Sequence, residues 1–263
     1  MLRPIVFAVA VMATPGAATA QRAPAARAIA DSARREIEAA QLVGDTLRLD
    51  AIRRYIAAGL KRYPNDALLL HYAGYAAYRR LNLVPDAEAE ARIPAMVKEA
   101  RALLERSINI RPMAESYAVL SSLIGRQIGY YPLQGDVYIL EAQAATMAGM
   151  NFASENPRVW LMNGIAAFYT MPQHGGGYPV VEKLLKRSIR FFEAEKVASP
   201  MPSWGHAEAY VWLGQALVKQ GRLDEARTAY TRALEIEPKF GWVTYVLMPA
   251  LEAESANRKA KTQ

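Results

Sequence analysis

The chain has 263 residues, of which 52% are hydrophobic and 22% are charged. That apolar content can build a substantial core and excludes wholesale disorder, and the length suits one or two domains. The absence of cysteine excludes disulfides, a thiol nucleophile and Cys-type zinc sites. Because only three histidines are present, we also expect no metal site and no cofactor.

The N-terminus has the pattern of a targeting segment. Arg3 precedes a short apolar run, Ile5–Ala13, and Ala18–Ala20 forms a small-residue cleavage site. We therefore expect a signal peptide over residues 1–20, cleaved after Ala20, and a mature protein that is periplasmic or secreted. The apolar run is far shorter than the roughly 20 residues that cross a bilayer, so we expect no integral membrane association.

Helical periodicity predicts that residues 21–263 form one domain of paired helices. A degenerate first pair covers Ala25–Ala40 and the segment around Ile52 and Ile56. Four clearer pairs and one last helix follow, at about 67–112, 114–154, 157–193, 207–240 and 241–258. Inserted loops are expected at 83–95, 127–135 and 171–179. The residues expected on the inward face of the last helix are Trp242, Val243, Val246, Leu247 and Leu251, and its polar tail suits a capping role.

The clearest pair closely resembles a tetratricopeptide repeat. Small residues at Gly214 and Ala226 allow the two helices to approach, Tyr230 fills the space between them, and Pro238 ends the second helix. The resemblance implies an all-α fold, a right-handed tetratricopeptide-repeat (TPR) alpha-solenoid of helix-turn-helix repeats with a C-terminal capping helix. Such a unit cannot bury its apolar face alone, so several must stack.

Over about residues 64–251, the chain also resembles a group of small exported bacterial repeat proteins. The features in common are Asn156-Pro157-Arg158 before a Trp helix, the Pro-x-x-Gly-Gly-Gly insertion at 172–177, and a last repeat that leads into Trp242. The inserted loops depart from the usual repeat length.

One motif invites a catalytic interpretation. His174-Gly175-Gly176-Gly177 matches an oxyanion-hole loop of lipases and esterases, but those enzymes also need a Gly-x-Ser-x-Gly nucleophile turn, which this chain lacks. No Gly-Lys-Ser/Thr follows the glycines, so a phosphate-binding loop is also excluded. We interpret the motif as a loop between two helices and expect that the protein is not an enzyme.

The remaining candidate function is recognition of a partner at the protein surface. In the tetratricopeptide-repeat family, the first helix of each repeat lines the concave face. The positions that the family pattern directs into the groove are His71, Tyr75, Tyr78, Arg79, Arg126, Arg158, Phe168, Tyr169, Gln215 and Lys219. Tyr and Arg are enriched at binding hot spots, although some of these aromatic residues could instead pack against inserted loops.

We therefore expect a non-catalytic protein-protein interaction scaffold of the bacterial cell envelope that binds a peptide or protein surface in its groove. The alternative is a solute-binding or transport-accessory component that encloses a small ligand. The formal charge of +7 is spread along the chain rather than gathered in a stripe, so no nucleic acid partner is expected. A peripheral anionic surface stays open as an electrostatic partner, and the oligomeric state is left open.

Overall fold

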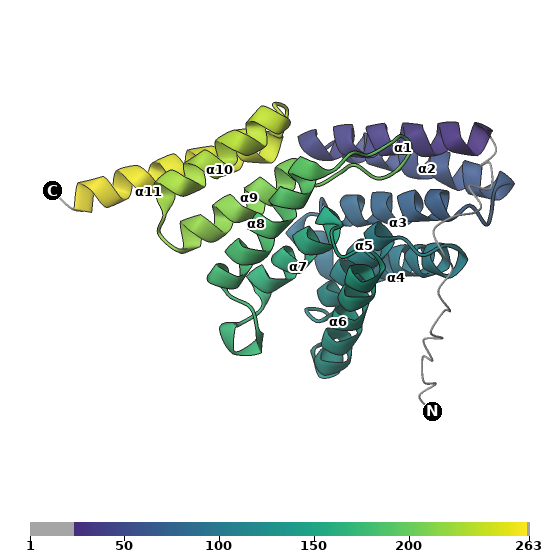
Figure 1. Cartoon of the computed structure of the whole chain (residues 1–263), viewed down its shortest axis with the longest axis horizontal. Helices are drawn as coiled ribbons and strands as arrows, with labels where there is room; N and C mark the ends of the chain where they lie inside the picture. The colour runs from purple at the N-terminus through teal and green to yellow at the C-terminus, as the bar shows by residue number, and fades with distance from the viewer. Residues whose placement is uncertain (1–23, 262–263) are drawn as a thin grey trace.

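In the computed structural model, which describes residues 24–261, the chain forms an all-α solenoid (Figure 1). Successive helices pair in antiparallel fashion, and the pairs stack along the chain from α1 to α11. The helices are α1 (Pro24–Val43), α2 (Thr46–Arg62), α3 (Ala67–Leu81), α4 (Asp86–Ile110), α5 (Ala114–Gln127), α6 (Gly135–Phe152), α7 (Pro157–Tyr169), α8 (Tyr178–Ala194), α9 (His206–Lys219), α10 (Leu223–Ile236) and α11 (Met248–Lys261). The predicted signal peptide lies outside the described residues.

Side-chain caps explain where several helices begin. Asp45, Asp66 and Asn156 have extended backbones, and each accepts hydrogen bonds from backbone N–H groups in the first turn of the helix that follows. These bonds satisfy donors that a helix start leaves unpaired. Two of the three caps open the first helix of a repeat, which fixes where each unit starts along the solenoid.

Within a unit, the two helices approach closely at a small residue. A Cβ atom added at Gly164 of α7 would lie 2.7 Å from Leu185 Cδ2 of α8. Burial of Leu185 and of the small residues facing it forms a continuous core that runs through the stacked units. None of the helices in residues 24–261 has the combination of length and apolar character that crossing a membrane requires.

The inserted segments differ partly from expectation. The segment 83–95 is a loop only at its start, because helix α4 begins at Asp86 and continues through Pro94. The other two insertions are short connections that contain 3₁₀ turns, Pro132–Gln134 and Pro172–His174. The first insertion therefore lengthens a helix instead of forming a loop over the groove.

A further connection, residues 195–205 between α8 and α9, has the largest effect on the architecture. It runs across the solenoid to α1, where Arg27 Nη2 donates to the Ser199 carbonyl at 3.0 Å (Figure 1). The hydroxyl of Tyr72 on α3 donates to the Pro200 carbonyl at 2.5 Å. This connection therefore fills the concave side of the first repeats with the chain itself.

The last helical stretch begins with a π-helical turn, Val243–Leu247, which continues into α11. Pro249 has no N–H for the carbonyl one α-helical turn earlier, and the wider turn accommodates its ring. The expected inward face is correct for Val243 and Leu251, which are buried, but wrong for Trp242 and Val246, which are 38% and 52% exposed. Since an indole is large, Trp242 leaves one side open to solvent while it packs beside α9.

Candidate functional site

The predicted groove residues of the N-terminal half are internal. His71, Tyr75 and Tyr78 on α3 are at most 6% exposed, and Arg79 and Arg158 are at most 3% exposed. The prediction that these five side chains line an open groove is therefore corrected. They are buried because the 195–205 connection and α1 lie over the concave face on which the repeat pattern places them.

Arg79 is the centre of this internal group. Its guanidinium forms two hydrogen bonds with the Glu208 carboxylate of α9, one of them at 2.6 Å, and its Nε donates to the Tyr75 hydroxyl at 2.8 Å. The same guanidinium lies 5.5 Å from the ring centroid of Trp204, which stacks on Tyr75 at 4.9 Å. We call Tyr75, Arg79, Trp204 and Glu208 the buried arginine–aromatic cluster.

Glu38 of α1 extends this hydrogen-bond chain. The Tyr75 hydroxyl donates to Glu38 Oε1 at 2.7 Å. Burial raises the pKa of the Glu38 carboxyl to about 7, and the nearby Arg79 charge opposes the rise. A carboxyl with such a pKa exchanges its proton near neutral pH, so the contact between α1 and α3 is sensitive to pH.

Arg158 and His71 are also fully buried, beside the arginine–aromatic cluster. Arg158 makes a second bidentate ion pair, with Glu195 at 2.6 and 2.9 Å, close to the start of the 195–205 connection. His71 Nδ1 lies 3.0 Å from the Ser116 hydroxyl, and burial lowers the pKa of the imidazole to about 3. A neutral, hydrogen-bonded histidine at this position has a packing role.

The remaining predicted residues are exposed or half-buried and belong to α5, α7 and α9. Phe168 and Tyr169, at the end of α7, each contact Trp212 of α9 edge-on, with ring centroids 5.4 and 5.9 Å apart. Trp212 contacts Trp242 at 5.9 Å in the same geometry. We call these four residues the aromatic strip. Tyr169 is 74% exposed, so the strip is accessible to a partner.

Two exposed basic side chains accompany the aromatic residues of the C-terminal half. Arg126, exposed at the end of α5, donates to Asn82 Oδ1 at 3.1 Å. Partial burial raises the pKa of the Tyr169 hydroxyl, and the positive charge of Arg126 opposes that rise, so the two side chains are close. Lys219 is the second, and it is exposed at the end of α9.

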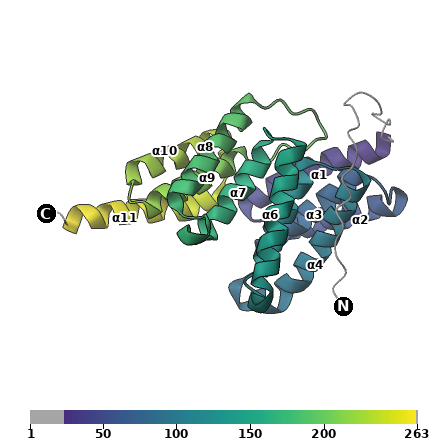
Figure 2. The same ribbon diagram turned by 60° about the horizontal axis from the view of Figure 1, so that its bottom comes forward.

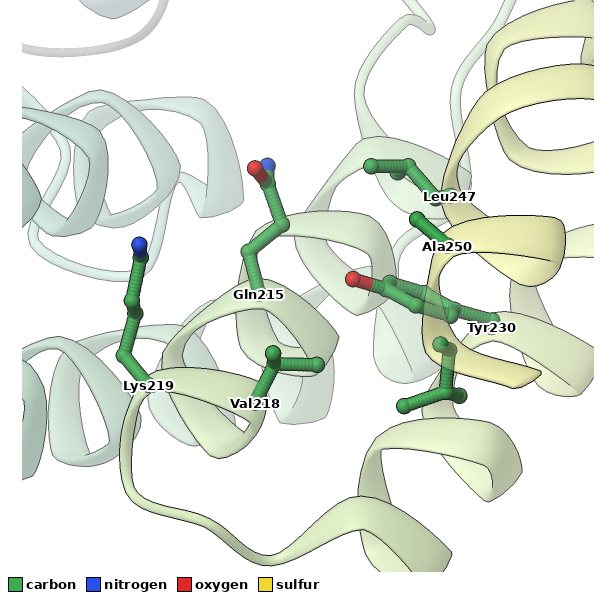
Figure 3. Close-up of a pocket in the computed structure, with 7 residues that line it drawn as sticks. Gln215, Val218, Lys219, Tyr230, Leu247 and Ala250 are labelled. Atoms are coloured by element: carbon green, nitrogen blue, oxygen red, sulfur yellow. The ribbon is translucent and has the colours of Figure 1, made fainter. Parts of the chain in front are cut away.

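Gln215 and Lys219 line a pocket of about 140 Å³ between α9, α10 and α11 (Figure 3). Figure 3 shows the Tyr230 hydroxyl pointing from α10 toward Gln215. The pocket is otherwise apolar, with Val218, Leu247, Ala250 and Leu251 in its wall. It offers room for one small apolar side chain next to an amide and an ammonium group.

The repeat pattern predicts Phe168, Tyr169, Gln215 and Lys219 as groove residues but does not predict the two tryptophans. Trp212 follows a position that the repeat pattern directs inward, and the pattern of the last helix predicts Trp242 in the interior. Their size is the signal that was available, since an indole reaches past its own helix and leaves an edge exposed.

The glycine loop at residues 174–177, whose sequence resembles an oxyanion-hole loop, lies in the connection between two helices. Its Gly175 and Gly177 adopt positive φ values of 86° and 97°, and His174 is exposed within the turn between α7 and α8. Among residues 24–261, no group of three or more His, Cys, Asp or Glu side chains is arranged to hold a metal ion.

Comparisons with known proteins agree with the geometry of the last repeat. Residues 207–240 match the family model described as "Tetratricopeptide repeat". A thermophilic TPR protein of Thermus thermophilus shares 20% identity, with 87% of this chain and 97% of that chain covered and a TM-score of 0.55. The HusA haemophore of Porphyromonas gingivalis shares 16% identity, with coverage of 73% and 94% and a TM-score of 0.61.

No curated protein matches the chain by sequence. At these identities, the two solved structures show a common fold and nothing about ligands. The chain therefore carries a tetratricopeptide repeat at residues 207–240 within the all-α helical-repeat fold of tetratricopeptide-repeat proteins.

Proposed function

We propose that this protein is a non-catalytic interaction scaffold of the bacterial cell envelope that binds an extended peptide on the concave surface of its C-terminal half. The aromatic strip carries the proposal, because it is a continuous row of rings across three consecutive helical units. Aromatic rings supply large contact area at a low cost in conformational entropy, and they are enriched at binding hot spots.

The chemistry of the surface defines the peptide. Apolar or aromatic side chains suit the strip, and a carboxylate suits Arg126 beside Tyr169. The apolar pocket beside Gln215 suits one small side chain, with a second carboxylate near Lys219. The preferred ligand is therefore a peptide that combines apolar residues with acidic groups.

Peptide selection from a random display library tests this proposal. The mature chain, residues 21–263, is the bait, and selected peptides are measured by fluorescence anisotropy. The double change Tyr169→Ala with Trp242→Ala should weaken binding about 30-fold or more, since one hot-spot residue contributes about 2 kcal/mol. The matched control is Tyr55→Ala on α2, a tyrosine that is 46% exposed and lies away from the strip.

The control should bind selected peptides as the wild type does. The double variant should lose some stability because Trp242 packs on Trp212, so binding is measured well below its melting temperature. Selected peptides that bind the double variant and the wild type equally would exclude the aromatic strip as the peptide site.

The second candidate, enclosure of a small ligand, has one specific reason to be tested, namely the fold similarity to the HusA haemophore. The pocket beside Gln215 is about 140 Å³, below the roughly 300 Å³ at which small-molecule sites begin. A second pocket of about 420 Å³, between the 153–157 connection and the end of α8, exceeds that size, but Glu155 and Glu195 line it and their carboxylates repel the anionic propionates of haemin. Absorbance titration with haemin, with HusA beside it, distinguishes the candidates, and we expect no saturable spectral change for this chain.

A further inference from the structure

Helix α6 carries an apolar face that the rest of the chain leaves uncovered. Val137, Leu140 and Met147 are 52%, 66% and 61% exposed, and Ala144 is also exposed. Leu133, in the turn before the helix, is 99% exposed. We call these five residues the α6 stripe.

The uncovered face results from how α6 is placed in the solenoid. Its opposite face packs on α5 through Ala145 and Gly149, which are buried. The next first helix, α7, packs on α5 far more than on α6, so α6 projects from the row of helices (Figures 1 and 2). The second helices of the other units, such as α8, are covered by the unit that follows.

The α6 stripe has the spacing of a coiled-coil seam. Its four residues on α6, Val137, Leu140, Ala144 and Met147, alternate at intervals of three and four, the pattern by which two helices pack along a common line. Leu133 lies four positions before Val137, in the 3₁₀ turn that leads into the helix. Helix α6 packs mainly on α5 through its opposite face, and the stripe residues stay exposed among residues 24–261. A second copy of α6, placed antiparallel, presents the same spacing of apolar residues. The α6 stripe can therefore pack against itself.

We propose that α6 forms an antiparallel helix pair with α6 of a second copy of this chain. In the favoured register, Val137 packs beside Leu140 of the second copy, and Ala144 packs beside Leu133 of the second copy. Large side chains thus face smaller ones in both layers, which fills the seam without gaps. The two helix dipoles also oppose each other.

The charges beside the stripe select this orientation. In the antiparallel pair, the Asp136 carboxylate faces the Gln143 amide of the second copy, a favourable hydrogen-bonding contact. In a parallel pair, Asp136 would instead face Glu141 of the second copy, which is a repulsive contact. Glu141 is already paired on its own chain with Arg101 at 2.9 Å.

The same charges argue against a membrane as the occupant. Residues 127–157 contain no Lys or Arg, and α6 carries two carboxylates. Helices that lie on anionic bilayers place Lys and Arg on their polar face. The α6 stripe therefore suits a protein surface of its own kind, and a membrane becomes an outcome of the test.

Analytical ultracentrifugation of the mature chain, from about 5 to about 500 µM, tests the dimer. One helix pair is small beside a standard interface of about 1,600 Å², so we expect a dissociation constant in the micromolar range. Leu140→Glu buries an unpaired charge in the seam and should raise that constant at least about tenfold, and Val137→Glu should act likewise, because Val137 packs beside Leu140 of the second copy. The matched control is Leu47→Glu on α2, a leucine that is 80% exposed and outside the stripe.

The control should dimerise as the wild type does. A wild-type chain that is monomeric throughout this range, or a dimer that both stripe variants leave intact, would overturn the proposal. Co-sedimentation of the chain with phosphatidylglycerol vesicles tests whether the stripe binds a membrane instead. Vesicle binding that disappears in Leu140→Glu, from a chain that is monomeric without lipid, would assign the stripe to a bilayer instead.

The orientation has its own measurement, because the chain contains no cysteine and one label can be placed at Asn151→Cys. The proposed register places the two-fold axis level with residues 138–139. At about 1.5 Å per residue, two spin labels at position 151 lie about 35–40 Å apart. A separation below about 20 Å would show a parallel pair and contradict the antiparallel arrangement.

Discussion

Arg79 of α3 and Glu208 of α9 form a bidentate ion pair across 129 positions of the chain, with side chains only 3% and 13% exposed. In a solenoid, each unit is expected to contact mainly its neighbours. This pair joins the first clear repeat to the last one. The buried arginine–aromatic cluster therefore connects parts of the solenoid that would otherwise be independent.

Loss of the Arg79 charge should be strongly destabilising. Arg79→Met leaves the Glu208 carboxylate without its counter-ion in a buried site, at a cost of about 3–5 kcal/mol in the free energy of unfolding. Urea unfolding followed by circular dichroism measures this loss. Adding Glu208→Gln to the variant should restore part of the stability, because no unpaired charge then remains.

The matched control for this prediction is Arg227→Met. Arg227 pairs with Glu252 at 3.1 Å, but both side chains are at least 40% exposed, and such surface pairs contribute about 0–1 kcal/mol. Equal losses for Arg79→Met and Arg227→Met would mean that the buried cluster does not couple the ends of the solenoid.

The pH dependence of stability should report on Glu38. Its folded-state pKa of about 7 lies above the ordinary value of 4.5, so the folded chain retains a proton that the unfolded chain has released between these values. The stabilisation is complete below pH 4.5 and is lost as the pH rises through 7. Relative to Glu38→Gln, the wild type should lose on the order of 3 kcal/mol between pH 4.5 and 8.

Comparing the two proteins at each pH removes the contributions of other groups. The lowered pKa values of His71 and His206 act in the opposite direction, since they favour folding as the pH rises, but both proteins contain them. A stability difference between wild type and Glu38→Gln that does not change with pH would contradict the raised pKa of Glu38.

The helix pairs could be predicted because each unit carries its own signal. The small residues and aromatic fillers of a repeat lie within one unit, as Gly214, Ala226 and Tyr230 do. Their spacing is local, and it survives in every unit even where a loop is inserted.

The buried cluster could not be predicted in the same way. Tyr75 and Arg158 each pair with a glutamate 37 positions away, and Arg79 pairs with one 129 positions away. The repeat frame predicts that these side chains face the groove. It contains no information that α1 and the 195–205 connection would cover that groove.

Export is a prediction that concerns residues outside the described part of the chain. Ala18–Ala20 predicts cleavage after Ala20, so the mature protein should begin at Gln21 and fractionate with the periplasm or the medium. Intact-mass measurement of protein purified from its native source checks this. Protein that retains residues 1–20 would contradict the prediction and leave the envelope location without support.

The packing of the last repeat gives a prediction in which two effects of one substitution oppose each other. A Cβ atom at Gly214 of α9 would lie 2.6 Å from Tyr230 Cδ1 of α10, so Gly214→Ala forces the buried tyrosine ring to move. Overpacking of this kind costs about 1–3 kcal/mol, whereas replacing a helical glycine with alanine gains up to about 1 kcal/mol of helix propensity.

Gly125 of α5 separates these two effects, because a Cβ atom there would have nothing within 4 Å. We expect Gly125→Ala to raise the melting temperature and Gly214→Ala to lower it, in thermal unfolding followed by circular dichroism. Gly214→Leu should lower it further, since a longer side chain displaces more of Tyr230. Trimming the ring with Tyr230→Leu in the Gly214→Ala background should recover part of the loss, because the two positions share one space. If Gly214→Ala raised the melting temperature as much as Gly125→Ala, the two helices would not be in the close contact that the repeat pattern requires.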